Sequence, residues 1–256
     1  MRCALTIAGS DSSGGAGIQA DIKTFAAFGV YGASAVTAIT AQNTQRVLSS
    51  VPLAPDLVAA QIDAVATDFD LDATKIGMLA TASIVDVVAS AIERHTLTRV
   101  VLDPVFVSSS GHLLLDTQGV ERLRTRLLPL VAVITPNADE AAALSGVPVR
   151  TVADARIAAH RLIAIGARAV VITGGHLEGG CVDIILEAGV LTELRGERIA
   201  AVHTHGTGCT FSSALAARLA MGDELVAAAR AAKQYVADAI HRAPGLGRGS
   251  GPLGHF

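Results

Sequence analysis

Apolar runs typical of buried β-strands alternate along the chain with segments whose apolar positions recur at helical spacing. Runs rich in Val, Ile, Leu and Ala predict strands at 3–8, 34–40, 73–77, 99–103, 130–134, 168–173 and 181–186. Helical spacing predicts helices near 16–28, 55–68, 81–94, 117–128, 138–145, 152–165, 208–221 and 223–242. Strands that are apolar on both faces and separated by helices favour a mostly parallel sheet with helices on both sides.

No linker, charge block or repeat divides this pattern, so we expect one domain over residues 1–256. The glycine-rich tail, 245–252, is expected to be irregular. The segment Phe25–Gln45 carries no charge and is long enough to cross a membrane. Glycines and polar residues interrupt it, and a helix end at Phe28–Gly29 explains its first part. We therefore interpret it as a helix end followed by a buried strand.

Polar motifs follow most of the predicted strands. They are 9–17 after the first strand, 42–43 after the second, 77–78 after the third, 103–105 after the fourth, 135–137 after the fifth and 174–175 after the sixth. The carboxyl ends of parallel strands meet at one edge of a sheet, which is where ligands bind in such folds. The shared edge predicts one composite site.

A tight turn precedes the helix predicted at 208–221. Gly206 and Gly208 leave no side chain between the backbone and a bound group, and the helix directs unpaired N–H groups at the turn. This arrangement favours an anion such as a phosphoryl group in transfer. An ordinary glycine turn before a surface helix is the simpler alternative.

The stretch Gly15–Ala20 matches the G-x-G-x-x-A pattern of dinucleotide-binding proteins. That pattern belongs at the strand-to-helix turn itself and is followed about 20 residues later by an acid that binds ribose. Here several residues separate strand and match, and residues 37–43 contain no carboxylate. We therefore interpret the loop as a polar pocket wall that approaches a small ligand closely.

Composition narrows the class of protein. The net charge is −3, no basic tract is present, aromatic residues make up 3% and Trp is absent, so nucleic-acid binding is not expected. The three cysteines are scattered without metal-site spacing, which suits a reducing compartment. The N-terminus has no basic region before an apolar run, so no signal peptide is predicted. We expect a cytoplasmic protein without a membrane partner.

Seven motifs in one order carry a family resemblance. They lie at 8–21, 40–44, 75–79, 102–105, 135–140, 174–177 and 204–210, and cover nearly the full length. Together they closely resemble the hydroxymethylpyrimidine/phosphomethylpyrimidine kinases of thiamine biosynthesis, in the ribokinase-like superfamily. The resemblance implies a three-layer α/β/α sandwich, ATP as co-substrate, Mg²⁺ and commonly a homodimer. It also implies two successive phosphorylations of 4-amino-5-hydroxymethyl-2-methylpyrimidine, to the monophosphate and then the diphosphate.

The resemblance also assigns substrate-binding roles. Gln42 resembles the family's pyrimidine-binding glutamine, and its carboxamide offers an acceptor and a donor side by side, as an aminopyrimidine edge requires. Asp21 resembles a second substrate contact, although it would be equally ordinary as a helix-surface carboxylate. Small or apolar neighbours of the ring are expected at Ala16, Thr40, Met78 and Val105, with core packing as the alternative.

For the nucleotide and metal, Asn137 and Glu140 match the Asn-x-x-Glu pattern that the superfamily uses to organise Mg²⁺ and phosphate. Mg²⁺ keeps several waters, so amide and carboxylate groups acting through water suffice. The same spacing predicts a helix capping box, and the two roles are compatible. Asp103 is a further metal candidate, or a turn residue. Lys233 resembles a family lysine near the nucleotide, and Thr210 is placed with it.

One position departs from the family. Thr173 stands before Gly-Gly-His where the family usually has Lys, so a cation near the nucleotide phosphates is missing. We expect weaker ATP binding, or compensation by another basic residue.

The residues expected to carry catalysis are Gly206, Thr207, Gly208 and Cys209. At a helix N-terminus the pKa of the Cys209 thiol should be lowered, so the thiol is a candidate base for the substrate hydroxyl. Phosphoryl transfer has a loose transition state that gains little from a strong base, so the backbone N–H groups of the turn are the alternative.

The sequence leaves three other functions as alternatives. A pyridoxal kinase shares the fold and the phosphoryl chemistry, and the sequence does not exclude action on both substrates. A non-catalytic pyrimidine-binding protein is favoured by Thr173 but opposed by the presence of Gly206–Cys209, Asp103, Asn137 and Glu140. A dehydrogenase is the weakest, because the ribose-binding acid is missing.

Overall fold

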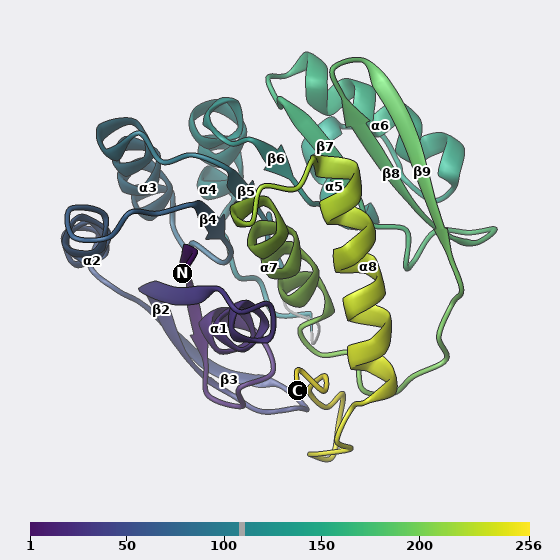
Figure 1. Ribbon diagram of the computed structural model, residues 1–256, viewed down its shortest axis with the longest axis horizontal. Helices are drawn as coiled ribbons and strands as arrows, with labels where there is room; N and C mark the ends of the chain where they lie inside the picture. The colour runs from purple at the N-terminus through teal and green to yellow at the C-terminus, as the bar shows by residue number, and fades with distance from the viewer. Residues whose placement is uncertain (108–110) are drawn as a thin grey trace.

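The computed structural model describes residues 1–107 and 111–256, and within these ranges nine strands form one sheet. Their order is β3-β2-β1-β4-β5-β6-β7-β8-β9 (Figure 1). The strands are Cys3–Asp11 (β1), Tyr31–Gln42 (β2), Val47–Pro52 (β3), Ala73–Ile76 (β4), Val100–Leu102 (β5), Val133–Ile134 (β6), Ala169–Ile172 (β7), Cys181–Glu187 (β8) and Val190–Gly196 (β9). The adjacent strands β2, β1, β4, β5, β6 and β7 are parallel to one another, while β3, β8 and β9 pair antiparallel to their neighbours.

Helices cover both faces of the sheet. They are Gly17–Ala27 (α1), Pro55–Ala66 (α2), Ala82–His95 (α3), Thr117–Arg122 (α4), Ala138–Ser145 (α5), Val152–Ala164 (α6), Thr207–Ala220 (α7) and Leu225–His241 (α8). Buried side chains of α2 to α6 form one hydrophobic cluster with the sheet, and those of α1, α7 and α8 form another. In Figure 1, α7 and α8 lie in front of the sheet. The predicted α/β sandwich of three layers, with a mostly parallel sheet, is confirmed.

The largest differences from the predicted elements are β3 and β9, which were missed. Both are antiparallel strands with many half-exposed or exposed positions, so neither shows the continuous apolar run of a buried parallel strand. The turn between β8 and β9 is Ala188-Gly189, and both residues have positive φ values of 48° and 79°. A two-residue turn of this kind is the usual connection of a hairpin.

Element ends also differ. β1 runs on to Asp11 through an irregularity between Ala8 and Ser10, in what was expected to be loop. The helix predicted at 117–128 is helical to Arg122 and continues as a π-turn over Leu123–Leu127 and a 3-10 turn over Leu128–Leu130. Pro129 lacks the N–H that a regular α-helix would need there. No helix in the described residues is both long and apolar enough to cross a membrane.

A buried ion pair joins the layers beneath the carboxyl edge of the sheet. Lys75 in β4 is fully buried, and its Nζ lies 2.9 and 3.0 Å from the two carboxylate oxygens of Asp21 in α1. Asp21 also accepts hydrogen bonds from Thr6 in β1 and Ser213 in α7, each at 2.6 Å. Asp103, which follows β5, lies 3.6 Å from Lys75 Nζ.

Burial disfavours the charged form of Lys75, but the charges of Asp21 and Asp103 and the hydrogen bonds that Lys75 donates to Asp21 raise its pKa above the usual value. Lys75 is therefore an ammonium at neutral pH. The Lys75–Asp21 pair and its hydrogen bonds thus connect strands β1 and β4 with helices α1 and α7.

Replacing Lys75 with Met leaves the buried carboxylate of Asp21 without its counter-charge. Breaking a buried pair in this way costs about 3–5 kcal/mol, so we expect a loss of that size in the free energy of unfolding, measured by urea denaturation. The double variant Lys75→Met with Asp21→Asn removes the unpaired charge and should recover part of the loss. A single-variant loss below about 1 kcal/mol, as for a surface substitution, would contradict this role.

Candidate active site

A cavity of about 1890 Å³ opens along the carboxyl edge of the sheet. It extends from the ends of β1 and β2, past those of β4, β5, β6 and β7, to β9 and α8. All of the predicted site residues except Asp21 and Thr210 line it. The predicted residues therefore lie along one cavity at the edge of the sheet, although their positions at the strand ends do not show what each residue binds.

One end of the cavity is bounded by β1 and β2. Gln42 lies at the end of β2, with its side chain next to Thr40, and Met78, Val105 and Ala16 line the same cavity. Thr40 is nearly buried, and its hydroxyl donates to the backbone carbonyl of Ser10 at 2.9 Å. A lining that combines the polar Gln42 and Thr40 with the apolar Met78 and Val105 suits a small heterocycle with a polar edge.

Asp11, at the end of β1, folds the following loop around its carboxylate. It accepts hydrogen bonds from the backbone N–H groups of Ser13, Gly15 and Ala16 and from the Ser13 hydroxyl, and His205 Nε2 lies 2.8 Å away. Burial works to raise the pKa of Asp11, but the hydrogen bonds from His205 and Ser13 outweigh it and hold the pKa below its usual value. The carboxylate is thus ionised and ties the loop to the turn before α7.

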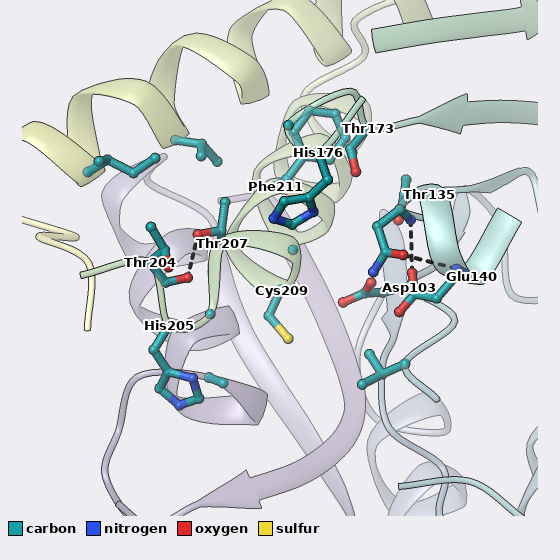
Figure 2. A pocket seen from close by; sticks show the side chains of 18 of the residues that line it. Asp103, Thr135, Glu140, Thr173, His176, Thr204, His205, Thr207, Cys209 and Phe211 are labelled. Atoms are coloured by element: carbon teal, nitrogen blue, oxygen red, sulfur yellow. Dashed lines mark hydrogen bonds between the residues drawn. The ribbon is translucent and has the colours of Figure 1, made fainter. Parts of the chain in front are cut away.

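The glycine turn reaches this loop closely. Gly206 begins α7 with a φ of 83°, and a Cβ there would collide with the Gly15 carbonyl. Glycine is therefore required by both the backbone conformation and the contact. α7 has no side-chain cap, and the Thr207 hydroxyl donates instead to the Thr204 carbonyl at 2.6 Å (Figure 2). The first turn of α7, with Gly208 exposed, faces the cavity as an anion site would.

Cys209 points its sulfur into the cavity between His205 and Asp103 (Figure 2). Burial raises the pKa of its thiol to about 12; Lys75 acts in the opposite direction, but the charges of Asp103 and Asp21 add to the rise. The prediction of a lowered pKa was therefore wrong. The helix N-terminus favours a thiolate, but burial and two nearby carboxylates disfavour it more.

Two carboxylates face each other in the middle of the cavity. Asp103 and Glu140 are 4% and 8% exposed. Burial raises the pKa of Asp103 although Lys75 opposes it, and burial together with the charge of Asp103 raises the pKa of Glu140 well above its usual value. Glu140 also closes the predicted capping box: its Oε2 accepts from Asn137 N–H at 2.9 Å, and Asn137 Oδ1 accepts from Glu140 N–H at 3.0 Å.

These groups fit a hard cation that keeps part of its water. Asp103 Oδ2 is buried and accepts no hydrogen bond from the described residues. A divalent cation near both carboxylates would relieve their mutual repulsion. In the same residues no cluster of three His, Cys, Asp or Glu side chains could hold a metal alone, so phosphate oxygens and water would complete the ligands.

The far end of the cavity is polar and basic. Lys233 Nζ lies 2.9 Å from Asp183 Oδ2, and Asp183 Oδ1 accepts from the Gly174 N–H at 2.8 Å. The Asp183 carboxylate thus bridges the Lys233 ammonium and the backbone N–H of Gly174, the residue after Thr173. Arg195 and Arg198 also line this end. They were not recognised from the sequence because β9, to which Arg195 belongs, lacks the continuous apolar run of a buried strand.

Two assigned residues need correction. Asp21 is fully buried in the ion pair with Lys75 and does not reach the cavity, so it supports the site from below and is not a substrate contact. Thr210 is fully buried in α7 with its hydroxyl 3.1 Å from His255 Nε2, so it is not placed to touch a nucleotide. Lys75 was missed, although a lone charge within the apolar run Ala73–Ile76 is a signal for a buried ion pair.

Comparisons with known proteins agree over nearly the whole chain. The hydroxymethylpyrimidine/phosphomethylpyrimidine kinase of Synechococcus elongatus is 48% identical over 255 residues, which is 99% of this chain and 97% of the relative. A pyridoxal kinase from Bacillus subtilis, solved with ADP, has a TM-score of 0.92 at 41% identity and covers 100% of this chain and 97% of its own. The phosphomethylpyrimidine kinase of Clostridium difficile has a TM-score of 0.84 at 39% identity, over 94% of this chain and 100% of its own.

The model of the phosphomethylpyrimidine kinase family matches residues 11–254, from the Asp11 loop to the C-terminal tail. This range contains the Gln42 end of the cavity, the glycine turn and the basic end of the cavity. The chain belongs to the phosphomethylpyrimidine kinase family.

Proposed function

We propose that this protein is an ATP-dependent kinase of thiamine biosynthesis. It phosphorylates 4-amino-5-hydroxymethyl-2-methylpyrimidine to the monophosphate and then converts the monophosphate to the diphosphate. The observation that carries the proposal is the position of the glycine turn, which lies between the Gln42 end and the basic end of one continuous cavity. Family membership and the 48% identical kinase relative support the same conclusion.

In the proposed mechanism the pyrimidine ring binds at the Gln42 end, against Ala16, Thr40, Met78 and Val105. Its hydroxymethyl group then faces the turn before α7. Phosphoryl transfer requires mainly positioning and neutralisation of charge. The N–H groups of the Gly206–Cys209 turn, including Gly208, stabilise the charge on the transferred group, and the positive end of α7 adds to this.

Mg²⁺ is part of the proposal, because the paired carboxylates suit it. Asp103 and Glu140 would hold the ion, with Asn137 fixing the Glu140 side chain through the capping box. When bound, Mg²⁺ supplies positive charge to the phosphate oxygens. Lys75 lies behind Asp103 and keeps that carboxylate paired in the absence of the ion.

The nucleotide is proposed to lie at the basic end, next to Thr173 and Lys233. Lys233 and Arg198 are the cations near the place where the family's usual lysine would stand. Thr210, which is buried in α7, contributes to the nucleotide site only by packing within that helix. We propose that Lys233 compensates in part for the missing charge at Thr173.

A homodimer is also proposed. Ile39 in β2 pairs with Val51 in β3, and these two side chains are 55% and 59% exposed; Leu48, in the same edge strand β3, is 59% exposed. Such a patch at a sheet edge suits a second copy of the chain. A monomer in sedimentation velocity at micromolar concentration would contradict it. The proposal treats residues 1–256 as one domain acting in the cytoplasm, where ATP is present, and recovery from a membrane fraction would oppose that.

The test of function is ³¹P NMR of the protein with MgATP and the hydroxymethylpyrimidine, beside a sample with pyridoxal. We expect monophosphate and then diphosphate signals from the pyrimidine. Pyridoxal phosphate alone would favour the second candidate, a pyridoxal kinase, which the TM-score of 0.92 to such an enzyme keeps in view. New phosphorus signals from neither substrate would contradict both and leave a binding protein.

Cys209 is not expected to act as the base. Because the pKa of its thiol is raised to about 12, the thiol stays protonated from pH 7 to 9 and kcat should not climb with thiolate formation over this range. Cys209→Ala should lower kcat by less than about 10-fold, whereas loss of a true general base costs about 100-fold or more. Gly206→Ala, which disturbs the turn itself, is the contrasting variant and should cost more than Cys209→Ala.

Thr173→Lys should restore a cation near the nucleotide phosphates. We expect the KM for ATP to fall by about 3- to 5-fold, the effect of an added charge pair of up to 1 kcal/mol. Thr173→Met, of similar length without charge, is the matched control. An unchanged KM in the lysine variant would show that this position does not bear on ATP binding here.

A further inference from the structure

Both backbone polar groups of Gln42 are hydrogen-bonded, so the orientation of its side-chain amide is the variable that decides what it can bind. The Ser12 hydroxyl accepts from the Gln42 N–H and donates to the Gln42 carbonyl, each at 2.8 Å. In the structure, Gln42 Nε2 lies 3.3 Å from His205 Nε2, and Gln42 Oε1 lies 3.3 Å from Thr40 Oγ1. A carboxamide has one donor and one acceptor end, which its hydrogen-bond partners distinguish.

The position of the proton on His205 determines which end of the Gln42 amide can face His205 Nε2. His205 Nε2 lies 2.8 Å from the buried carboxylate of Asp11, an acceptor that also receives three backbone N–H groups. A carboxylate has no proton to donate, so the Nε2–H must be on the imidazole, whether the ring is neutral or charged. The same Nε2 then has no lone pair for the Gln42 amide. The proton that Nε2 gives to Asp11 can be shared with Gln42, as a second acceptor at 3.3 Å, only if Oε1 and not Nε2 faces it.

The proton on Thr40 decides the second contact independently. The Thr40 hydroxyl has a single proton, which it gives to the Ser10 carbonyl at 2.9 Å, the shorter of its two contacts. Towards Gln42 it therefore presents a lone pair, which needs an N–H partner. Half a turn of the Gln42 amide about its last bond exchanges Oε1 and Nε2 and satisfies both His205 and Thr40.

We propose that His205 is a positioning residue that, with Thr40, fixes the Gln42 carboxamide with Oε1 on the His205 side and Nε2 on the Thr40 side. The remaining lone pair of Oε1 and the remaining N–H of Nε2 then face the cavity in a set order. They match a ring that carries an amino group beside an unprotonated ring nitrogen, with the amino group on the His205 side. This deepens the proposed function and rests on it.

The arrangement links substrate recognition to the phosphoryl site. His205 is next to Gly206, whose backbone contacts Gly15 in the Asp11 loop. The residue that orders the Gln42 amide therefore belongs to the same turn as the proposed anion-binding N–H groups. Gln42 can present its ordered edge only while that turn is packed against the Asp11 loop.

Neutron diffraction from a crystal of the deuterated protein without ligand tests the assignment directly. We expect a deuteron on His205 Nε2 directed at Asp11, and two deuterons on the Gln42 atom nearest Thr40. Deuterons of the Gln42 amide on the His205 side, or a bare His205 Nε2, would overturn the proposal. This result does not depend on whether the protein phosphorylates anything.

Binding of the hydroxymethylpyrimidine, measured by calorimetry without nucleotide, tests the consequence. His205→Met removes the donor and should weaken binding by about 3- to 10-fold, the range for one hydrogen bond. His205→Gln keeps a terminal N–H as many bonds from Cα as His205 Nε2, and should restore most of the affinity. His160→Met, which changes an exposed histidine of α6 that does not line the cavity, is the control and should leave the affinity within about 2-fold, less than the loss of one hydrogen bond.

A double-mutant cycle separates positioning from general damage. In a Gln42→Ala background His205→Met should cause no further loss, because the amide that it orders is gone. Additive losses, or equal weakening by His205→Met and His205→Gln, would contradict the proposal. If the wild-type protein does not bind the pyrimidine at all, the proposed function fails, while the neutron result still decides the orientation of Gln42.

Discussion

The buried ion pair between Lys75 and Asp21 is the interaction on which the site depends. It sits under the carboxyl edge of the sheet, and Asp21 is bound at once by β1, β4 and α7. Asp103 is paired with the same ammonium at 3.6 Å, so the placement of the candidate metal-binding carboxylate follows from it. A charge this deep is tolerated only because each partner is met by opposite charge and by hydrogen bonds. It fixes where α1 and α7 begin relative to the strand ends.

Above this ion pair, two loops far apart in the sequence meet at closely packed glycines. Gly206 fits against the Gly15 carbonyl, and Gly17 fits against the Gly9 carbonyl, where any side chain would collide. Asp11 closes the contact by accepting from its own loop and from His205. The result explains why Gly15–Ala20 matches a dinucleotide pattern by letter. Gly15 serves the contact between the Asp11 loop and the turn before α7, and Gly17 serves close packing against Gly9 within the Asp11 loop.

The parallel strands and the shared site edge could be predicted because each leaves a local mark. Continuous apolar runs identify strands covered on both faces, and polar residues at their ends identify the edge. β3 and β9 lack that mark, so Arg195 and Arg198 were not recognised. The errors at Asp21, Thr210 and Cys209 have another origin, because burial and the charge of Lys75, Asp103 and Asp21 are brought together only by folding. Asn137 and Glu140 form the predicted capping box and also line the cavity, so the same spacing is compatible with both predicted roles.

The central claim is that the turn at Gly206–Cys209 receives the phosphoryl group between a pyrimidine bound at Gln42 and a nucleotide bound at Thr173 and Lys233. A crystal structure with Mg²⁺, a non-hydrolysable ATP analogue and the hydroxymethylpyrimidine tests it most directly. We expect the terminal phosphate within hydrogen-bond distance of the Gly208 and Cys209 N–H groups, with the hydroxymethyl oxygen facing it and the ring on Gln42. A terminal phosphate held away from this turn, or a pyrimidine bound at the Lys233 end, would contradict it.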